Sequence, residues 1–405
     1  MLIFFALISE LVYIFFAVKR GLFGLLDLHD NSTALLIVVL LSLLFICYFC
    51  TYYFTDWIRV NIKTIYFFAL VFNITFLFIP FLTSNDLFSY IFQSRVFSHF
   101  GKNPYLIPYD SFPNDQLYES IKTIWSSNTL RTGPLFLFIG AFINLIGQNS
   151  LTLTILLFKI LLVGANILNV FLIFKISKST KATFLYALNP LVIFELAGNA
   201  HNESLLILFL LISLLFLLKR PILSFSTLIA STLVKYSTFI LLPLYLVFIK
   251  RKGWKILCIA LSLGTLIVVT FYLPFWSGLH IFNGLIAFYN GKYISPSLGI
   301  LIGQKIFGSY ELSFKINTLV FLVVITTIII KSFLSKLTFK QFVFYSFLIY
   351  WVYLSTKLSL VLTWYLTPLI ALASLCASWK KQEKYAMSGL IFIGFYCLLL
   401  FYFVR

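Results

Sequence analysis

The chain has 405 residues, of which 61% are hydrophobic, 19% aromatic and only 10% charged. A soluble domain carries about 25% charged residues, so this composition excludes an ordinary soluble protein. The net charge of +18 would suggest a nucleic-acid partner in a soluble chain. In a membrane protein, basic residues chiefly set the orientation, so we expect membrane lipids and no nucleic acid as partners.

Apolar stretches of about 18 or more residues recur from end to end, and each can cross a hydrocarbon core about 30 Å thick. The alternating ten-residue segments of an outer-membrane barrel are absent. The sequence therefore predicts an all-α polytopic membrane protein with about 13 transmembrane helices. The predicted spans are residues 2–18, 34–53, 64–83, 151–174, 182–198, 204–218, 222–235, 236–249, 256–275, 315–331, 342–356, 358–375 and 386–403.

The N-terminal segment is predicted to stay in the membrane. Residues 1–18 carry Glu10 and have neither a basic N-terminal region nor a small-residue cleavage site, so we expect a first transmembrane helix rather than a signal peptide. Residues 1–63 then form two additional N-terminal helices, and residues 64–405 form the main module.

Basic residues indicate the orientation of the chain. With a cytoplasmic N-terminus, six short loops become cytoplasmic and hold more than half of the 30 basic residues, as the positive-inside rule expects. Two long outer segments remain, residues 84–150 and 276–314. In this arrangement residues 134–148 do not cross, because 15 residues are too few for a span; they form a juxtamembrane helix at the outer surface.

The first outer segment opens with an acid at the end of an apolar run. Asp86 starts a predicted amphipathic helix, because Asp86, Tyr90, Gln93 and Phe97 recur at helical spacing. An unpaired charge at this depth usually has a function. The alternative is a first-turn acid, stabilised by the helix dipole by up to about 1 kcal/mol. Three later acids are expected at the surface: Asp110, Asp115 and Glu119.

Basic residues also lie on the predicted outer side. Snorkelling or contact with lipid headgroups explains most of them. Lys235 differs, because it lies inside the apolar sequence "STLVKYSTFILLP" and requires a buried anion, for which a lipid phosphate is the candidate. The others include Arg95, Lys102, Lys122, Arg131, Lys292, Lys305, Lys315 and Lys357.

The sequence "LNPLVIFELAGNAHNES" holds a dense polar cluster between two spans. Asn189-Pro190 is expected to break or kink a helix. Glu195 lies near the outer end of a helix, where an acid is usually functional. Four hydrogen-bonding side chains together are typical of a polar ligand site: Asn199, His201, Asn202 and Glu203. None of the four histidines is three or four residues from another, so we do not expect His201 to bind a metal.

Five segments occur in the order found in membrane glycosyltransferases of the GT-C superfold. They are "NDLFSYIFQSRVFSHFGKNPYLIP", Trp125, "TGPLFLFIGAFINLIG", "ALNPLVIFELAGNAHNES" and "LVKYSTFILLPLYL". Over about residues 64–370 the chain is most similar to the polyprenol-phosphate-mannose-dependent α-(1→6)-mannosyltransferases of bacterial envelopes. The later segment "LTWYLTPL" also resembles the tryptophan-tyrosine-proline segment of that family.

The resemblance implies a catalytic aspartate in the first outer loop, which is Asp86, and a sugar-and-phosphate site between this loop and the outer helix ends. One departure concerns Thr132, which precedes Gly133-Pro134 where the family usually has tyrosine. This departure leaves open which sugar or acceptor is bound. Together with the outer cations, the motifs predict these substrate-binding residues: Tyr90, Arg95, Asn103, Tyr105, Arg131, Asn199, His201, Asn202, Glu203, Lys235, Tyr236, Lys292, Trp364 and Tyr365.

These residues predict an inverting transfer of mannose or another hexose at the outer face of the plasma membrane. Asp86 would take the proton of a glycan or lipid-linked acceptor, while Lys235 would stabilise a polyprenyl phosphate leaving group. No second carboxylate lies in the next turn after Asp86, so we expect no metal, and no cofactor beyond the lipid-linked donor.

Two other classes remain open. A flippase or transporter of lipid-linked sugars should have discontinuous helices or inverted repeats near the midplane, and the sequence indicates neither. A polymerase or ligase that uses a diphosphate-linked donor would rely on outer arginines and a histidine. The predicted outer segments contain only Arg95 and Arg131 as arginines.

Overall fold

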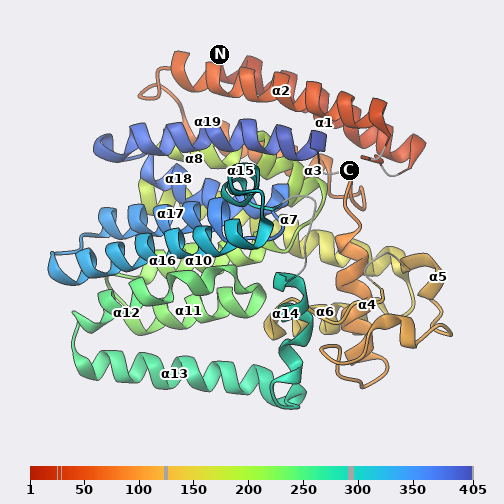
Figure 1. The fold of residues 1–405 in the computed structure, drawn as a ribbon. Coiled ribbons are helices and arrows are strands. Elements are labelled where there is room, and N and C mark those ends of the chain that lie inside the picture. The colour runs from red at the N-terminus through yellow and green to blue at the C-terminus, as the bar shows by residue number, and fades with distance from the viewer. Residues whose placement is uncertain (25, 29, 123–125, 291–295, 404–405) are drawn as a thin grey trace.

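The structure is a computed structural model that describes residues 1–405 apart from residues 25, 29, 123–125, 291–295 and 404–405. The described residues form helices joined by turns, and no strand occurs among them. Most helices lie side by side, with α1 and α2 along one flank and α13 along the opposite flank (Figure 1). The predicted all-α polytopic fold is confirmed.

The helices and short helical turns have the following bounds: α1 Leu2–Phe23, α2 Asn31–Phe54, α3 Ile62–Thr75, α4 Asp86–Ser98, η1 Tyr109–Ser111, α5 Tyr118–Ile121, α6 Pro134–Gly147, α7 Leu151–Ser177, α8 Thr180–Ala187, α9 Pro190–Val192, η2 Ile193–Gly198, α10 Glu203–Phe216, α11 Pro221–Val234, η3 Tyr236–Leu241, α12 Leu242–Lys250, α13 Trp254–Tyr272, η4 Leu273–Phe275, η5 His280–Phe282, α14 Asn283–Asn290, α15 Leu298–Phe307, α16 Tyr310–Leu334, α17 Phe339–Thr356, η6 Thr363–Leu366, α18 Thr367–Cys376 and α19 Lys380–Phe403.

Six of the described helices are long and apolar enough to cross a membrane. They are Leu2–Gly21, Asn31–Phe54, Leu151–Ser177, Trp254–Phe275, Tyr310–Leu334 and Lys380–Phe401. Shorter apolar helices of 10–17 residues occupy most of the other predicted spans. Helix α6 has 14 residues, about 21 Å of helix at 1.5 Å per residue, which agrees with the prediction of a short helix at residues 134–148.

Two predicted spans are helical over a shorter range than expected. The span predicted at 64–83 ends as a regular helix at Thr75, because a proline and a run of small polar residues follow. The span predicted at 358–375 is helical only from Thr363. Its first residues are not helical, and the carbonyl of Leu358 accepts a hydrogen bond from the backbone N–H of Ser297, the residue before α15.

Several helices are discontinuous, which the sequence did not indicate beyond the break at Asn189-Pro190. The Asn189 side chain caps α9, and Pro190 is its first residue. A wide π-helical turn follows at Ile193–Gly198, and the chain bends by 117° across residues 199–202 into α10. Extended backbone at Lys235 separates α11 from η3. Discontinuous helices were the feature expected of a transporter. Because this chain has them, their presence or absence cannot be used to distinguish a transporter from an enzyme.

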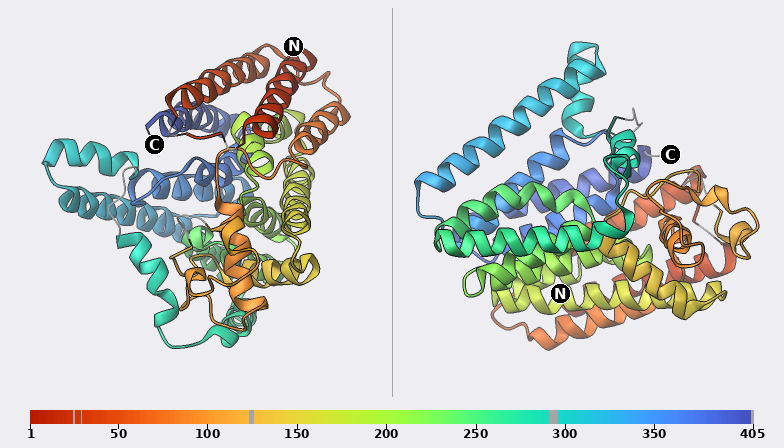
Figure 2. Two further views of the ribbon diagram at one scale, coloured as in Figure 1. Left: turned by 90° about the vertical axis from the view of Figure 1, so that its right-hand side faces the viewer. Right: turned by 90° about the horizontal axis from the view of Figure 1, so that it is seen from below.

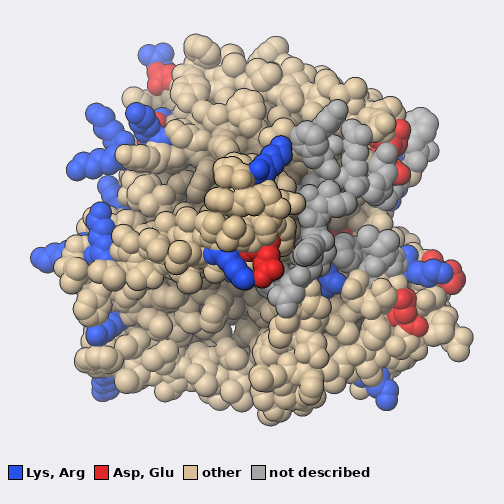
Figure 3. All heavy atoms as spheres, viewed as in Figure 1, with Lys and Arg blue, Asp and Glu red and all other residues tan. Residues whose placement is uncertain are grey.

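The two ends of the helices differ in charge. Lys and Arg side chains gather at the left-hand end in Figure 3. In the same view, this end holds the turns from α12 to α13 and from α16 to α17, which the sequence predicts to be cytoplasmic (Figure 1). Helices α4 and α5 lie at the opposite end. Helices α15 and α16 project from the rest of the molecule (Figure 2).

Buried polar contacts fix α4 against α6. The side-chain amide of Asn144 in α6 donates to the carbonyl of Ile91 at 3.1 Å and to the hydroxyl of Ser94 at 2.6 Å. Both acceptors belong to α4, so the helix that begins with Asp86 cannot rotate without leaving a buried amide unpaired.

A buried ion pair holds the loop after α4. Nη2 of Arg95 lies 2.6 Å from Oδ2 of Asp115, and each side chain is only 2% exposed. Asp115 also accepts from the backbone N–H of Leu117 at 2.7 Å. The prediction that Asp115 lies at the surface is therefore wrong, because a distant arginine pairs with it. Asp110 and Glu119 are exposed, as predicted.

Candidate active site

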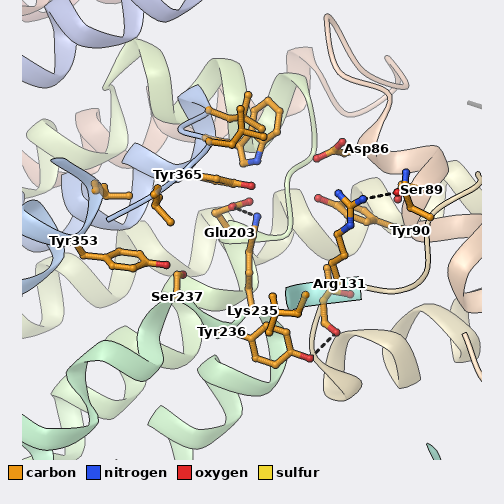
Figure 4. Close-up of a pocket in the computed structure, with 18 of the residues that line it drawn as sticks. Asp86, Ser89, Tyr90, Arg131, Glu203, Lys235, Tyr236, Ser237, Tyr353 and Tyr365 are labelled. Carbon is orange, nitrogen blue, oxygen red and sulfur yellow. Dashed lines mark hydrogen bonds and ion pairs between the residues drawn. The ribbon is translucent and has the colours of Figure 1, made fainter. Parts of the chain in front are cut away.

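A cavity that is partly open to the surroundings lies where α4, the break before η3, α17 and η6 meet (Figure 4). One face of α4 lines it with Asp86, Ser89, Tyr90 and Gln93, which recur at helical spacing. The helix predicted to begin at Asp86 is confirmed, and its first two turns present polar side chains to the cavity. It is not amphipathic as predicted, because most of its circumference is buried and Phe97 packs against Phe138 and Phe275 instead of lining the cavity.

Asp86 is the first residue of α4, and the segment before it is held by Asn199. The side-chain oxygen of Asn199 accepts from the backbone N–H groups of Leu82, Thr83 and Ser84 at 3.0, 2.8 and 3.2 Å. The Asp86 side chain is 20% exposed. Burial raises the pKa of its carboxyl above the usual 3.8, while nearby His201 and Lys235 lower it by a smaller amount.

His201 lies directly behind Asp86, away from the open side of the cavity. Its Nδ1 is 3.6 Å from Oδ2 of Asp86, and its Nε2 is 3.3 Å from Oε2 of Glu195. Neither His201 nor Glu195 has an exposed side chain. The imidazole stacks on Trp364 of η6, with ring centroids 3.9 Å apart and an 18° angle between the rings.

Lys235 reaches the cavity from the break between α11 and η3. Its ammonium forms an ion pair with Glu203, the first residue of α10. It also lies 4.6 Å from the ring centroid of Tyr365, a cation–π contact. The lysine side chain is 20% exposed and Glu203 only 2%. The buried anion required by Lys235 is therefore a carboxylate of this chain, although the ammonium still faces the cavity.

The "TGPL" segment forms the wall next to Lys235. The N–H of Gly133 donates to the carbonyl of Val234 at 3.1 Å, and a Cβ at residue 133 would collide with the backbone of Leu233. Only glycine permits this approach. The hydroxyls of Tyr105 and Tyr236 donate to the carbonyl of Thr132 at 3.1 and 3.2 Å, which places Arg131 in the cavity lining.

The remaining wall of the cavity is apolar. It comes from α14, from the end of α17 and from the extended segment before η6. A cavity with carboxylates and cations on one side and leucines on the other suits an amphiphilic ligand. The apolar lining residues include Leu285, Leu354, Leu358, Leu360 and Leu362, next to Tyr350 and Tyr353.

The structure brings most of the predicted substrate-binding residues together. Asn199, His201 and Asn202 lie just behind the cavity wall and are fully or almost fully buried. The residues of the prediction that line the cavity itself are Asp86, Tyr90, Arg131, Glu203, Lys235, Tyr236, Trp364 and Tyr365.

Besides the three residues behind the cavity wall, three further predicted residues do not line the cavity. Arg95 is paired with Asp115. The amide of Asn103 donates to the carbonyl of Phe275 at 2.7 Å, and Tyr105 is buried against Thr132. These residues hold the outer loop in place. Lys292, also predicted, lies outside the described residues.

Two supporting residues were absent from the predicted site. Lys159 of α7 is fully buried, and its ammonium donates to the carbonyls of Ala197 and Gly198 at 2.6 and 3.2 Å. It thereby caps the turn that leads to His201. A lysine in the middle of an apolar span was a visible signal for it. Glu195 was noted as an unusual acid but not assigned to the site.

Among the described residues, no group of three or more His, Cys, Asp or Glu side chains is arranged to hold a metal ion. Asp86, Glu195 and Glu203 are the nearest acids to the cavity, and His201 or Lys235 lies beside each of them. Metal independence remains a prediction.

Comparisons with known proteins show the family of the chain. Residues 17–251 match the sequence profile of a family described as Alpha-(1->6)-mannopyranosyltransferase, N-terminal domain. Alpha-(1->6)-mannopyranosyltransferase A of Corynebacterium glutamicum is 26% identical over 220 residues, which cover 53% of this chain and 39% of that protein. Alpha-(1->6)-mannopyranosyltransferase B of the same organism is 34% identical over 140 residues, 33% of this chain and 23% of that protein.

Alpha-(1->6)-mannopyranosyltransferase A of Mycobacterium tuberculosis is 27% identical over 129 residues, which cover 31% of this chain and 25% of that protein. The chain thus matches well under half the length of each of these relatives. The family profile itself extends over more than half of the chain and includes Asp86, the polar cluster at His201 and Lys235. The chain therefore belongs to the α-(1→6)-mannopyranosyltransferase family.

Proposed function

We propose that the protein is an inverting glycosyltransferase that moves mannose, or another hexose, from a polyprenyl-phosphate donor to a lipid-linked or glycan acceptor. The observation that carries this proposal is the cavity. A carboxylate, Asp86, and an ammonium, Lys235, face the same space, and one wall of that space is lined by leucines. Membership of the α-(1→6)-mannopyranosyltransferase family supports the sugar and the reaction class.

In the proposed step, Asp86 accepts the proton of an acceptor hydroxyl as the hydroxyl oxygen forms a bond to the anomeric carbon. The bond from this carbon to the phosphate oxygen breaks, and its electron pair stays on the phosphate. The products are the new glycoside and polyprenyl phosphate, with one proton on Asp86. A single displacement inverts the anomer, so a β-linked donor gives an α-glycoside.

The two sides of the cavity suit the two ends of the donor. Lys235 and Arg131 would stabilise the negative charge that develops on the leaving phosphate. The leucines of the opposite wall would contact the first prenyl units, with about 25 cal/mol of stabilisation for each Å² of apolar surface removed from water. A donor with its phosphate at Lys235 would then place its sugar toward Asp86.

We place the reaction at the outer face of the plasma membrane. This part of the proposal is supported by the charge distribution, since the basic turns gather at one end of the helices and α4 lies at the other (Figures 1 and 3). If the basic turns are cytoplasmic, Asp86 faces the extracytoplasmic side.

The direct test is turnover by the purified protein in detergent. We expect release of polyprenyl phosphate together with mannosylated product from a short-chain polyprenyl-phosphate mannose and mannoside acceptors. The rate should be unchanged by EDTA, because no step in the proposed mechanism uses a metal. Loss of activity in EDTA that Mg²⁺ or Mn²⁺ restores would contradict metal independence. Movement of intact donor across vesicle membranes without product would favour a transporter.

The pH dependence of turnover should reflect the protonation of the Asp86 carboxyl. A general base must be deprotonated, and burial raises the pKa of this carboxyl. We therefore expect kcat to fall as the pH decreases through this raised pKa, at a higher pH than an exposed aspartate with a pKa of about 3.9 would cause. The measurement is kcat between about pH 4 and pH 8 at saturating donor. Full activity down to pH 4 would contradict the assignment.

A further inference from the structure

His201 has a carboxylate at each of its two ring nitrogens. Oδ2 of Asp86 is 3.6 Å from Nδ1, and Oε2 of Glu195 is 3.3 Å from Nε2. A neutral imidazole has one donor nitrogen and one acceptor nitrogen, so it would direct a lone pair at one carboxylate. A doubly protonated imidazolium offers a donor to both. Neither ring nitrogen makes a hydrogen bond in the structure. What favours a charged ring is the presence of a carboxylate oxygen within 3.3 to 3.6 Å of each nitrogen.

The charges around His201 point the same way. The ionisable side chains whose charge would influence Asp86 are His201, Lys235, Glu203 and Glu195. With a neutral imidazole, the three carboxylates would have only Lys235 and the Arg131 guanidinium of the same cavity as nearby cations, and uncompensated buried charge is costly. The other ionisable side chains beside these acids are Cys397 of α19 and Tyr90, and burial raises the pKa of Tyr90.

Glu195 is held in place independently of His201. It accepts hydrogen bonds from the amide of Asn199 at 2.9 Å and from the hydroxyl of Thr363. It lies in the π-helical turn Ile193–Gly198, a rare geometry that is frequent at functional sites. Ala200, just before His201, has a φ of 58°, in the left-handed region that non-glycine residues rarely adopt. The chain thus maintains strained backbone where it presents the imidazole.

We propose that Glu195 and His201 form a buried charged dyad behind Asp86, in which Glu195 holds His201 as an imidazolium. The imidazolium keeps the Asp86 carboxylate ionised and oriented toward the acceptor. Glu195 and His201 are positioning residues, because Asp86 lies between them and the cavity. The role of this dyad rests on the proposed function, because it requires Asp86 to be the base. The charge of the His201 ring does not, since it is a property of the protein without substrate.

The charge of His201 can be measured without turnover, by ¹⁵N NMR of histidine-labelled protein in detergent at about pH 7.5. The chain has four histidines, so His29→Gln, His99→Gln and His280→Gln assign the His201 signals by elimination. We expect two protonated ring nitrogens in wild type and a neutral ring in Glu195→Gln. A neutral His201 in wild type, or a spectrum unchanged by Glu195→Gln, would overturn the proposal.

The kinetic measurement tests whether the dyad acts on Asp86. Because a general base typically contributes 10²–10⁴-fold, we expect Glu195→Gln to lower kcat by roughly 10–100-fold while KM changes by less than about threefold. The matched control is Glu10→Gln, the same change at a partly buried carboxylate of α1 that accepts from Thr75; it should leave both constants unchanged. Unchanged kcat in Glu195→Gln would overturn the role of the dyad.

The two parts can fail separately. A charged His201 in a wild-type protein that releases no polyprenyl phosphate would contradict the proposed function and still support the charged dyad. A neutral His201 in an active enzyme would contradict the charged dyad and still support the proposed function.

Discussion

Asp86→Asn is expected to lower kcat by roughly 10²–10⁴-fold, the contribution that a general base typically makes. Asparagine has the same shape and can remain at the start of α4, but it cannot accept the proton of the acceptor hydroxyl. Donor binding should change little, because the cations that face the phosphate are untouched. The measurement is the release of polyprenyl phosphate and product, together with donor affinity, for wild type and variant.

The matched control is Asp110→Asn, an exposed acid of the same outer segment that accepts from the hydroxyl of Tyr118. It should retain wild-type turnover. The competing view of Asp86 is that of a first-turn acid stabilised by the helix dipole. In that case Asp86→Asn would lower the unfolding free energy by up to about 1 kcal/mol and leave kcat unchanged. The two measurements therefore separate a base from a helix-start residue.

Parts of this site could be predicted from the sequence because their signals are local. The helix that begins at Asp86 follows from apolar periodicity and an acid at its first turn. The break before Pro190 follows from the absent N–H of proline and the capping side chain of Asn189. The polar cluster at residues 199–203 is visible because hydrogen-bonding side chains are rare between two apolar spans.

Other parts depend on pairs that are distant in the sequence. Nothing local shows that Arg95 pairs with Asp115, so an arginine predicted to bind substrate instead holds a loop. The ion pair between Lys235 and Glu203 joins two helices. The apolar wall could not be predicted either, because a leucine that lines a cavity and a leucine that faces lipid have the same periodicity.

The pair of Lys235 and Glu203 gives the second large expected effect. Lys235→Met should lower kcat/KM by about 10²–10³-fold, which is typical when one group that stabilises a developing oxyanion is removed. The same change leaves Glu203, 2% exposed, without its partner. Removing one member of a buried ion pair typically costs 3–5 kcal/mol, and because Lys235 is 20% exposed we expect about 3 kcal/mol of lost stability. Activity and the midpoint of thermal unfolding in detergent are the two readouts.

The double variant Lys235→Met/Glu203→Gln separates the two roles of the lysine. Glutamine at residue 203 carries no charge, so most of the lost stability should return. Turnover should not return, because no ammonium faces the leaving phosphate. The equivalent pair on the surface, Lys315 with Glu311, is 69% and 75% exposed, and Lys315→Met/Glu311→Gln should change neither readout. If Lys235→Met/Glu203→Gln recovered turnover together with stability, Lys235 would serve only to neutralise Glu203, and the phosphate would have to be bound by other cations such as Arg131.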